Sequence, residues 1–418
     1  MDLQTQIHDF GRRARAAARL LRQCSTEQKN RGIIAMAEQV LAAQEEILAA
    51  NRADLEKAQA DGLSAAMIDR LTLDPKRLAK MADGIREVAA LPDPVGEILR
   101  DWTRPNGLRI QKKRVPIGVI GIIYESRPNV TSDAAVLCLK TGNATILRGG
   151  RESIHSNVAI ARALSAGCAT VGLPADAILL IPTTDREAVR VLCEMDQYLD
   201  CIVPRGGKGL IETVVSHARM PVIKHYDGIC IMYVDRDADL AMAERIVLNA
   251  KVQRPGVCNA IETVLVHRDV AARFFAQAGR ALLEQKVEIR GDDATCALLP
   301  EAKAATAQDY RTEFLDLILA TRVVDGVEEA ISHIEENGSH HSDGIVTANE
   351  QTAERFLAEV DSATVYWNAS TRFTDGGEFG FGAEIGISTD KLHARGPMAL
   401  EELTTYKYVL RGTGQIRS

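Results

Sequence analysis

The chain has 418 residues, 46% of them hydrophobic and only 4% aromatic, so it is long enough for two or three domains with mainly aliphatic cores. Its formal net charge is −7 with acidic and basic residues interspersed, and because no basic stripe stands out we expect no nucleic-acid partner. No apolar run approaches the roughly 20 residues that cross a bilayer, and the eight cysteines show no C-x-x-C or regular framework, so we expect a soluble, cytoplasmic protein with reduced thiols, no membrane partner and no metal site.

The first 90 residues or so have helical patterns throughout. Turn signals at Asp61-Gly62, Asp74-Pro75 and Leu91-Pro92-Asp93-Pro94 separate the predicted helices. This part carries no chemical motif of its own. Residues 96–114 then alternate loosely between polar and apolar, as in 108–112, which predicts exposed hairpin strands.

From Val115 onward, apolar strands alternate regularly with helices. Strands are predicted over 119–124, 144–148, 178–181, 199–203 and 222–223. The longer helices are predicted over 131–140 and 156–171, and Thr184 with Glu187 has the spacing of a capping box for the next one. Continuous apolar strands joined by helices predict a parallel sheet covered on both faces, in a doubly wound nucleotide-binding architecture.

Two glycine-rich turns follow strands of this sheet, at the edge where such sheets bind ligands. The turn Arg148-Gly149-Gly150-Arg151 lets backbone approach a ligand between two arginines, which suits a phosphorylated ribose and favours NADP over NAD. Two solvated arginines on a tight turn explain it equally well. The turn Arg205-Gly206-Gly207-Lys208-Gly209 frees a helix N-terminus for an anion or a ring, although it matches neither a P-loop nor G-x-G-x-x-G.

A single thiol, Cys258, lies in the segment Gln253-Arg254-Pro255-Gly256-Val257-Cys258-Asn259. A predicted helix over 238–252 precedes it and an apolar strand over 261–266 follows. The Pro-Gly turn exposes the thiol, and the nearby Arg254 would lower its pKa from a free value of about 8.5 and favour the nucleophilic thiolate. The alternative is a small buried hydrophobe, the usual fate of a free cysteine.

A second α/β series follows the thiol. Strands are predicted over 317–324, 344–347 and 363–367, with helices over 327–336 and 351–360. Residues 370–390 are rich in glycine and form a long loop, a candidate lid or cleft wall. The tail over 405–411 alternates as an exposed strand, which needs a partner in either the hairpin near Leu108 or another subunit.

The sheet, the glycine-rich turns, the central thiol and the strand after it resemble the aldehyde dehydrogenase superfamily. The segments 254–260 and 336–345, the second with Ser339-His340-His341-Ser342, resemble the branch that reduces an acyl phosphate in proline biosynthesis. This resemblance covers essentially the whole chain. It implies an α/β fold with a doubly wound parallel-sheet NADPH-binding domain (1–98 and 116–227), an α/β catalytic domain (228–395), and small oligomerisation strands (99–115 and 396–418) of a homo-oligomer.

The implied reaction is the NADPH-dependent reduction of L-glutamate 5-phosphate to glutamate 5-semialdehyde with loss of phosphate. Cys258 would be the thiol that accepts the acyl group, and the resulting thioester would take a hydride from NADPH. The resemblance also makes glutamate 5-kinase, which produces the labile acyl phosphate, a candidate partner. Two alternatives are an aldehyde dehydrogenase that works in the oxidative direction and a non-enzymatic nucleotide-binding scaffold, which the thiol in its Pro-Gly turn opposes.

Several cofactor contacts follow from the resemblance by position. Arg148 falls where the superfamily has a lysine on the adenosine ribose, and Gly206 and Gly207 fall beside the diphosphate. Glu313 falls near the glutamate that holds the nicotinamide ribose, although the glycine and proline that usually follow it are missing here.

Two departures from the superfamily pattern bear on the chemistry. Oxidising members have Glu-Leu-Gly-Gly-Lys where this chain has Lys224-His225-Tyr226-Asp227-Gly228, so the base that activates water for thioester hydrolysis is absent, as expected of a reductase. The oxyanion asparagine usually lies in a Pro-Trp-Asn turn, and residues 124–129 differ from it. Ser126, Asn129 or a backbone amide near Cys258 would then donate to the oxyanion.

The charged ends of the substrate need countercharges from the protein. Carboxylate and phosphate groups match arginine, and Arg127 and Arg254 are the candidates. His340 and His341 could contact substrate, or the pair could lie at the surface, and their spacing gives no metal site.

Overall fold

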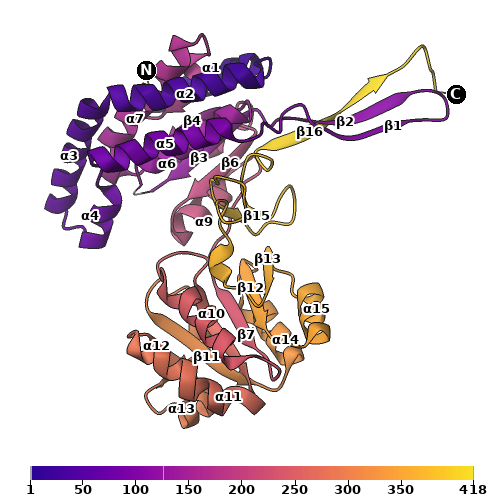
Figure 1. Cartoon of the computed structure of the whole chain (residues 1–418). Helices are drawn as coiled ribbons and strands as arrows, with labels where there is room; N and C mark the ends of the chain where they lie inside the picture. Colours follow the sequence, from indigo (N-terminus) through magenta and orange to yellow (C-terminus); the bar gives the residue numbers. More distant parts are fainter. Residues whose placement is uncertain (1, 126, 418) are drawn as a thin grey trace. The chain divides into compact units, whose positions relative to one another are not determined.

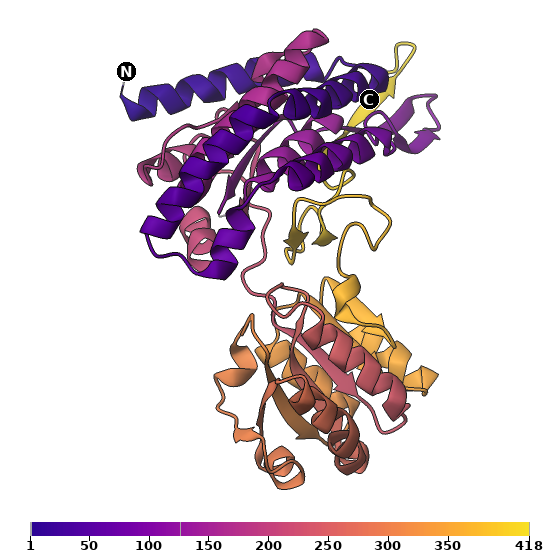
Figure 2. The same cartoon turned by 60° about the vertical axis from the view of Figure 1, so that its left-hand side comes forward.

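The computed structural model describes residues 2–125 and 127–417, which form two compact units. Unit 1 comprises the chain up to Lys224, residues 380–386 and the chain from Met398 onward, and unit 2 comprises 225–379 and 387–397. Figures 1 and 2 show helices and strands in both units. The division falls at 224/225, close to the expected 227/228, and the 380–386 segment groups with unit 1. Within the described ranges, no helix is long and apolar enough to span a bilayer.

Unit 1 begins with the expected helical region: α1 (Leu3–Leu21), α2 (Thr26–Ala42), α3 (Gln44–Ala60), α4 (Ala65–Leu71) and α5 (Pro75–Ala90). Local sequence sets these boundaries. Ser25 and Gln28 form a capping box at α2, and Asp74 caps α5 with Pro75 as its first residue. These helices pack against later helices of the unit. Helix α2, for example, lies beside α7 (Ile154–Thr170) (Figures 1 and 2).

The sheet of unit 1 is parallel, as expected, with order β5-β4-β3-β6. Its strands are β3 (Val119–Tyr124), β4 (Ala144–Arg148), β5 (Ile178–Leu180) and β6 (Cys201–Arg205), and its other helices are α6 (Asn129–Lys140), α8 (Glu187–Cys193) and α9 (Lys208–His217). Strands β3, β4 and β5 are buried at every residue, because helices cover a parallel sheet on both faces.

Two local predictions were wrong. Val222 makes only an isolated bridge with Ile202, so 222–223 is not a strand of the sheet. The capping box of Thr184 does not form either: Arg186 is the N-cap of α8 without a side-chain bond, and the Glu187 amide donates to Asp185 Oδ1 at 2.9 Å. A neighbouring aspartate competed for the same amide, which sequence spacing alone does not resolve.

The hairpin and the tail of unit 1 form one antiparallel sheet. Strand β2 (Arg109–Pro116) lies between β1 (Ile98–Thr103) and β16 (Thr404–Arg411). Strand β16 pairs with β2 along its whole length, which settles the partner of the tail in favour of the hairpin. Figure 1 shows the three strands as an elongated ribbon.

The sheet of unit 2 is parallel with order β10-β9-β11-β8-β7-β12-β13. The strands are β7 (Cys230–Val234), β8 (Ile261–His267), β9 (Glu288–Gly291), β10 (Lys303–Ala304), β11 (Ile318–Val324), β12 (Ser342–Val346) and β13 (Thr364–Trp367). The helices are α10 (Leu240–Val252), α11 (Arg268–Phe274), α12 (Arg280–Glu284), α13 (Asp293–Leu298), α14 (Val327–Asn337) and α15 (Glu350–Glu359), and β14 (Ile387–Ser388) pairs with β15 (Gly396–Pro397). Apolar clusters form its core, and both contain residues of β7 and β8.

Candidate active site

The thiol of Cys258 lies on the turn between α10 and β8 in unit 2, as the sequence predicts. Its side chain is half-buried, so the thiol keeps access to solvent. The loop before β7 presses against it: a Cβ on Gly228 would lie 2.2 Å from the Cys258 carbonyl oxygen and 2.5 Å from its Cα. Only glycine therefore fits at 228, and this close approach fixes the backbone of the thiol turn.

Two imidazoles lie beside the thiol. Sγ of Cys258 and one ring nitrogen each of His225 and His341 all lie within 4.8 Å of one another. The imidazole rings meet edge to face, with centroids 5.3 Å apart. Nδ1 of His225 is 2.9 Å from the Ile387 carbonyl, which can only accept, so Nδ1 carries the hydrogen and Nε2 is the basic nitrogen of the neutral ring.

His341 is held by a chain of buried hydroxyl groups. Its Nδ1 lies 2.9 Å from Ser342 Oγ, which lies 2.7 Å from Thr374 Oγ1, and that oxygen is 2.8 Å from the Tyr366 hydroxyl. Nε2 of this fully buried ring has no hydrogen-bond partner within the described part of the chain. An unpaired buried nitrogen is costly, and such groups are common where a ligand or a reacting proton is to be bound.

A second thiol, Cys230, lies behind the first. Its Sγ donates to the Cys258 carbonyl at 3.2 Å and is 3.5 Å from His341 Nδ1. Burial raises the pKa of Cys230 well above its usual value, and Asp343 adds to the effect. Cys230 therefore stays a neutral thiol that supports the turn, whereas Cys258 is the accessible one.

An arginine that the sequence did not single out, Arg372, lies next to the thiol turn. Its guanidinium contacts the side-chain oxygens of Asn259 and Gln253, the latter at 2.7 Å. Burial lowers the pKa of Arg372, and the neighbouring Arg254 lowers it further. A cavity of about 210 Å³ opens beside it, lined by Asn249, Gln253, Arg372, Phe373, Asp375 and Glu378. The site thus offers cations for an acidic group and carboxylates for an ammonium group.

Glu313 also belongs to this neighbourhood. It is half-buried and accepts a hydrogen bond from the Gly228 backbone, the same glycine that contacts Cys258. Burial raises the pKa of Glu313, while the hydrogen bond from Gly228 and the charge of His225 oppose the rise. The structure therefore brings Glu313 near the thiol, and its contact with a nicotinamide ribose stays a prediction.

The turn after β4 in unit 1 is built around Arg148. Its side chain is only 8% exposed and donates to the carbonyls of Gly149 at 3.0 Å, Thr184 at 3.1 Å and Asp185 at 3.3 Å. Its Nε is buried and without a hydrogen-bond partner in the described ranges. Gly149 and Gly150 continue the turn, and Arg151 is exposed and pairs with Glu152 at 3.3 Å. Arg148 thus ties the β4 turn to the loop after β5 and still has one unpaired donor.

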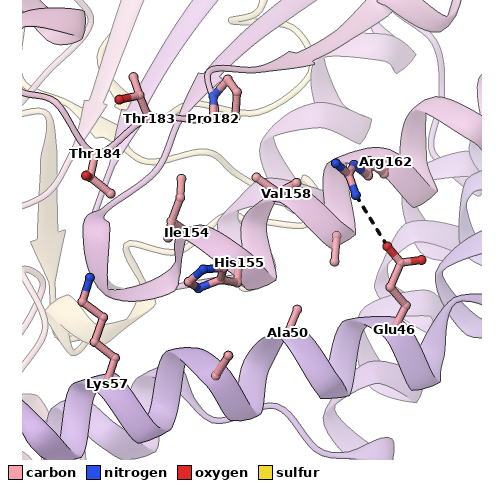
Figure 3. Close-up of a pocket in the computed structure, with 12 residues that line it drawn as sticks. Glu46, Ala50, Lys57, Ile154, His155, Val158, Arg162, Pro182, Thr183 and Thr184 are labelled. Carbon is pink, nitrogen blue, oxygen red and sulfur yellow. Dashed lines mark ion pairs between the residues drawn. The ribbon is translucent and has the colours of Figure 1, made fainter.

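A cavity of about 650 Å³ opens beside that loop, between α3 and α7. It is lined by Glu46, Ala50, Ala53, Lys57, Ile154, His155, Val158, Ala159, Arg162, Pro182, Thr183 and Thr184. Figure 3 shows Lys57 and Glu46 on one helix, with Arg162 paired to Glu46 from the facing helix and Thr183 and Thr184 on the loop. It lies at the carboxyl end of β5, where sheets of this kind bind cofactors.

The turn after β6 opens α9 without a side-chain cap. The Gly207 amide donates to Glu125 Oε2 at 2.9 Å, so a carboxylate already occupies this helix N-terminus as an anion would. A Cβ on Gly207 would meet nothing within 4 Å, whereas one on Gly206 would lie 2.4 Å from Glu125 Oε2. Arg205 packs on the 380–386 segment, because a Cβ on Gly386 would lie 2.6 Å from its Nη1. Contact of Gly206 and Gly207 with a dinucleotide diphosphate therefore stays a prediction.

The remaining predicted residues lie in unit 1, beside the thiol cluster in unit 2, or outside the described residues. Ser126 falls outside them, so its oxyanion role stays a prediction. Asn129 is the exposed first residue of α6 in unit 1, and its amide donates to Asp133 at 2.8 Å. Arg127, which precedes α6, is half-buried. Of the substrate candidates in unit 2, Arg254 is exposed on the thiol turn, and His340 lies next to His341 with φ of 56°.

Sequence reasoning missed His225 and underrated His341. His225 lies in the segment where the superfamily base is missing, and an imidazole at that place was a usable signal. His341 is buried against the thiol, whereas its neighbour His340 has 36% of its side chain exposed. Sequence spacing does not show which of two adjacent histidines is buried, because burial depends on how the chain enters β12.

Comparisons with known proteins show the family to which this chain belongs. Residues 3–313 match the model of the aldehyde dehydrogenase family. The chain is 58% identical over 417 residues to a protein named gamma-glutamyl phosphate reductase from Moorella thermoacetica, with all of both chains covered. It is similar to the solved gamma-glutamyl phosphate reductase of Thermotoga maritima, with TM-score 0.97, 46% identity, and 99% of this chain and 100% of that chain covered. An engineered glycolyl-CoA reductase with bound NADP⁺, 15% identical over 96% of each chain, shares the fold alone at TM-score 0.66.

Proposed function

This chain belongs to the aldehyde dehydrogenase family, a family of oxidoreductases with a nicotinamide cofactor, and we propose that it reduces L-glutamate 5-phosphate to L-glutamate 5-semialdehyde with NADPH. That reaction is a step of proline biosynthesis. The observation that carries the proposal is the 58% identity over the full length to a gamma-glutamyl phosphate reductase. The half-buried thiol between two imidazoles supports it, because the proposed chemistry needs a nucleophile.

The first chemical step is acyl transfer to Cys258. The thiol gives its proton to a ring nitrogen of His225 or His341, and the thiolate attacks the carbonyl carbon of the acyl phosphate. A carbon–sulfur bond forms, the carbon–oxygen bond to phosphate breaks, and phosphate leaves. Arg254 lies on this turn and Arg372 bonds Gln253 and Asn259 beside it, so the two would offset the charge of the phosphate or of the substrate carboxylate.

The second step reduces the thioester. When bound, NADPH supplies a hydride to the thioester carbon. The turns at Arg148 and Gly207 would hold the dinucleotide and the carboxylate of Glu313 its nicotinamide ribose. The unpaired Nε of Arg148 supports this assignment, whereas Glu125 would have to release the Gly207 amide. The thiohemiacetal on Cys258 then expels the thiolate and releases the aldehyde, and the protonated imidazole returns its proton to sulfur.

The oxidative alternative differs from the proposed reductase in the direction of the reaction. Lys224 stands where oxidising members have the glutamate that activates water, so the chain has no carboxylate at that place to hydrolyse the thioester. A thioester protected from water survives until it is reduced or, in reverse, until phosphate attacks it. This departure favours an enzyme that exchanges acyl groups with phosphate.

Turnover in the reverse direction tests the proposal. Purified protein with glutamate 5-semialdehyde and NADP⁺ should produce NADPH only when inorganic phosphate is present, because phosphate must remove the acyl group from Cys258. NAD⁺ in place of NADP⁺ should support slower turnover. Sustained NADPH formation without phosphate would instead identify a hydrolytic aldehyde dehydrogenase.

A further inference from the structure

The cluster around Cys258 contains more coordinating groups than acyl transfer requires. Acyl transfer needs one thiolate and one base, whereas the structure places two imidazoles and a thiol within 4.8 Å of one another. One thiolate and two imidazoles match the three protein ligands of an open zinc site. We propose that Cys258, His225 and His341 form a binding site for a borderline-soft divalent cation of the Zn²⁺ class, whose binding blocks the thiol.

The hydrogen bonds at Nδ1 of both imidazoles are compatible with coordination through Nε2. Nδ1 of His225 donates to the Ile387 carbonyl at 2.9 Å, which leaves Nε2 as the basic nitrogen. Nδ1 of His341 is 2.9 Å from Ser342 Oγ, and Nε2 is the buried nitrogen without a hydrogen-bond partner in the described ranges. A hydrogen bond to Nδ1 that orients the ring and leaves Nε2 for the metal is the usual outer-shell arrangement of metal-binding histidines.

Burial and charge select the kind of cation. No carboxylate belongs to the three-residue cluster, and sulfur with nitrogen ligands prefers Zn²⁺ to Mg²⁺ or Ca²⁺. His341 is fully buried and Cys258 is half-buried, so a bound cation would be covered by protein at His341 and approached from the side of Cys258. Cys230 lies behind this turn, but its Sγ donates to the Cys258 carbonyl at 3.2 Å, so its hydrogen is held away from the cluster. The fourth position would therefore hold water.

Binding would replace the thiol proton. The S–H bond breaks, a sulfur–metal bond forms, and the proton is released to solvent, so affinity rises with pH. A metal-bound sulfur has given its lone pair to the cation and no longer attacks an acyl phosphate. Metal binding itself is independent of the reaction, and only the inhibition rests on the proposed function.

A titration with Co²⁺ tests the site without substrate. About one equivalent per chain should produce the visible bands of four-coordinate cobalt and a thiolate-to-cobalt charge-transfer band in the near ultraviolet. Cys258→Ser should abolish the charge-transfer band, and His225→Ala should weaken affinity at least about 100-fold. Cys296→Ser, a half-buried thiol elsewhere in unit 2, and His340→Asn, next to His341, are matched controls that should keep the band.

His341 is buried, so its replacement could prevent folding, and a second measurement covers that case. Prior alkylation of the native protein at Cys258, verified by peptide mass spectrometry, should remove the cobalt band. Zn²⁺ should inhibit turnover and EDTA should restore it. A band that persists in Cys258→Ser, or no band in the native protein, would overturn the proposal. Cobalt binding by the three residues in a protein without reductase activity would instead reject only the proposed function.

Discussion

At the scale of single residues, the site is a thiol surrounded by groups that control one proton. Cys258 is accessible, Cys230 behind it is kept neutral by burial, and the two imidazoles can accept the proton of Cys258. The hydroxyl chain from Ser342 to Tyr366 holds His341 in place. The site thus differs from one that uses a carboxylate base. Imidazoles near Cys258 can take the thiol proton, and the carboxylate that activates water in oxidising members is absent.

Removing an imidazole should make the thiol less reactive. We expect His225→Asn to slow the alkylation of Cys258 by iodoacetamide at neutral pH about tenfold, because the imidazole that can accept the thiol proton is removed. The rate of alkylation of the peptide that contains Cys258, measured by mass spectrometry in the presence of EDTA, tests this expectation. His340→Asn should leave the rate unchanged, and Asn tolerates the positive φ at that position. An unaltered rate in His225→Asn would show that the imidazole does not set the reactivity of the thiol.

At the scale of elements, helix α9 presents the feature most open to test. Its N-terminal amide, on Gly207, donates to Glu125 Oε2, and Gly207 has open space around the position of a Cβ. We expect Gly207→Ala to raise the KM for NADPH about tenfold, because a methyl group would keep the diphosphate from the amides. Thermal stability should not fall, since φ of −72° suits alanine.

A matched control separates contact from helix propensity. Gly84→Ala in α5 also adds a methyl group where nothing lies within 4 Å, and it should leave the KM for NADPH unchanged. Equal KM values in Gly207→Ala and the native protein would mean that the dinucleotide does not approach α9.

Helix α14 carries a histidine whose charge state couples stability to pH. Burial, aided by Arg322, lowers the pKa of His333 to about 4, whereas an unfolded histidine titrates near 6.5. The unfolded state therefore binds more protons between these values. The contribution to stability is complete above about pH 6.5 and is lost as the pH falls toward 4.

Removing this histidine should flatten the pH dependence. Between pH 7 and 5 the free energy of unfolding of the native protein should fall about 2 kcal/mol more than that of His333→Gln. Urea unfolding at both pH values measures the difference. Equal changes in the two proteins would show that folding does not lower the pKa of His333.

At the scale of the whole molecule, much of the architecture follows from the sequence and some of the site does not. The strands Val119–Tyr124 and Ala144–Arg148 and the helix ending at Val252 were predicted well, because buried parallel strands and Pro-Gly turns are strong local signals. Strand β7 (Cys230–Val234), at the centre of unit 2, was not predicted, although it is fully apolar and buried. A short apolar run of this kind fits a strand or a buried helix segment equally well.

Long-range contacts explain what was missed in the site. His225, Cys258 and His341 come from three separate segments, and only the parallel order of β8, β7 and β12 brings these segments together. Arg372 reaches the thiol turn through Asn259 in the same way. The Pro-Gly turn indicated Cys258 and the family resemblance supplied Glu313, whereas the partners of Cys258 required the folded chain.

One face of the antiparallel sheet of unit 1 carries exposed aromatic and aliphatic side chains of β16. Tyr406, Tyr408 and Leu410 are exposed on alternate residues of β16, and Trp102 meets Tyr408 edge to face at 6.3 Å. We propose that this face binds another copy of the chain, because exposed apolar side chains on an edge strand favour such a contact. We expect Tyr408→Asp to reduce the molar mass measured by light scattering during gel filtration. Lys407→Asp on the opposite face should not reduce it, and a mass unchanged in Tyr408→Asp would argue against self-association through this sheet.

A rapid-mixing experiment on Cys258 examines the covalent chemistry itself. Without phosphate, glutamate 5-semialdehyde and NADP⁺ should give a burst of NADPH of about one equivalent per chain and then almost no turnover, because the acyl group stays on sulfur. Added phosphate should restore steady turnover, and Cys258→Ala should show no burst. A burst that survives in Cys258→Ala, or steady turnover without phosphate, would contradict acyl transfer from Cys258 to phosphate.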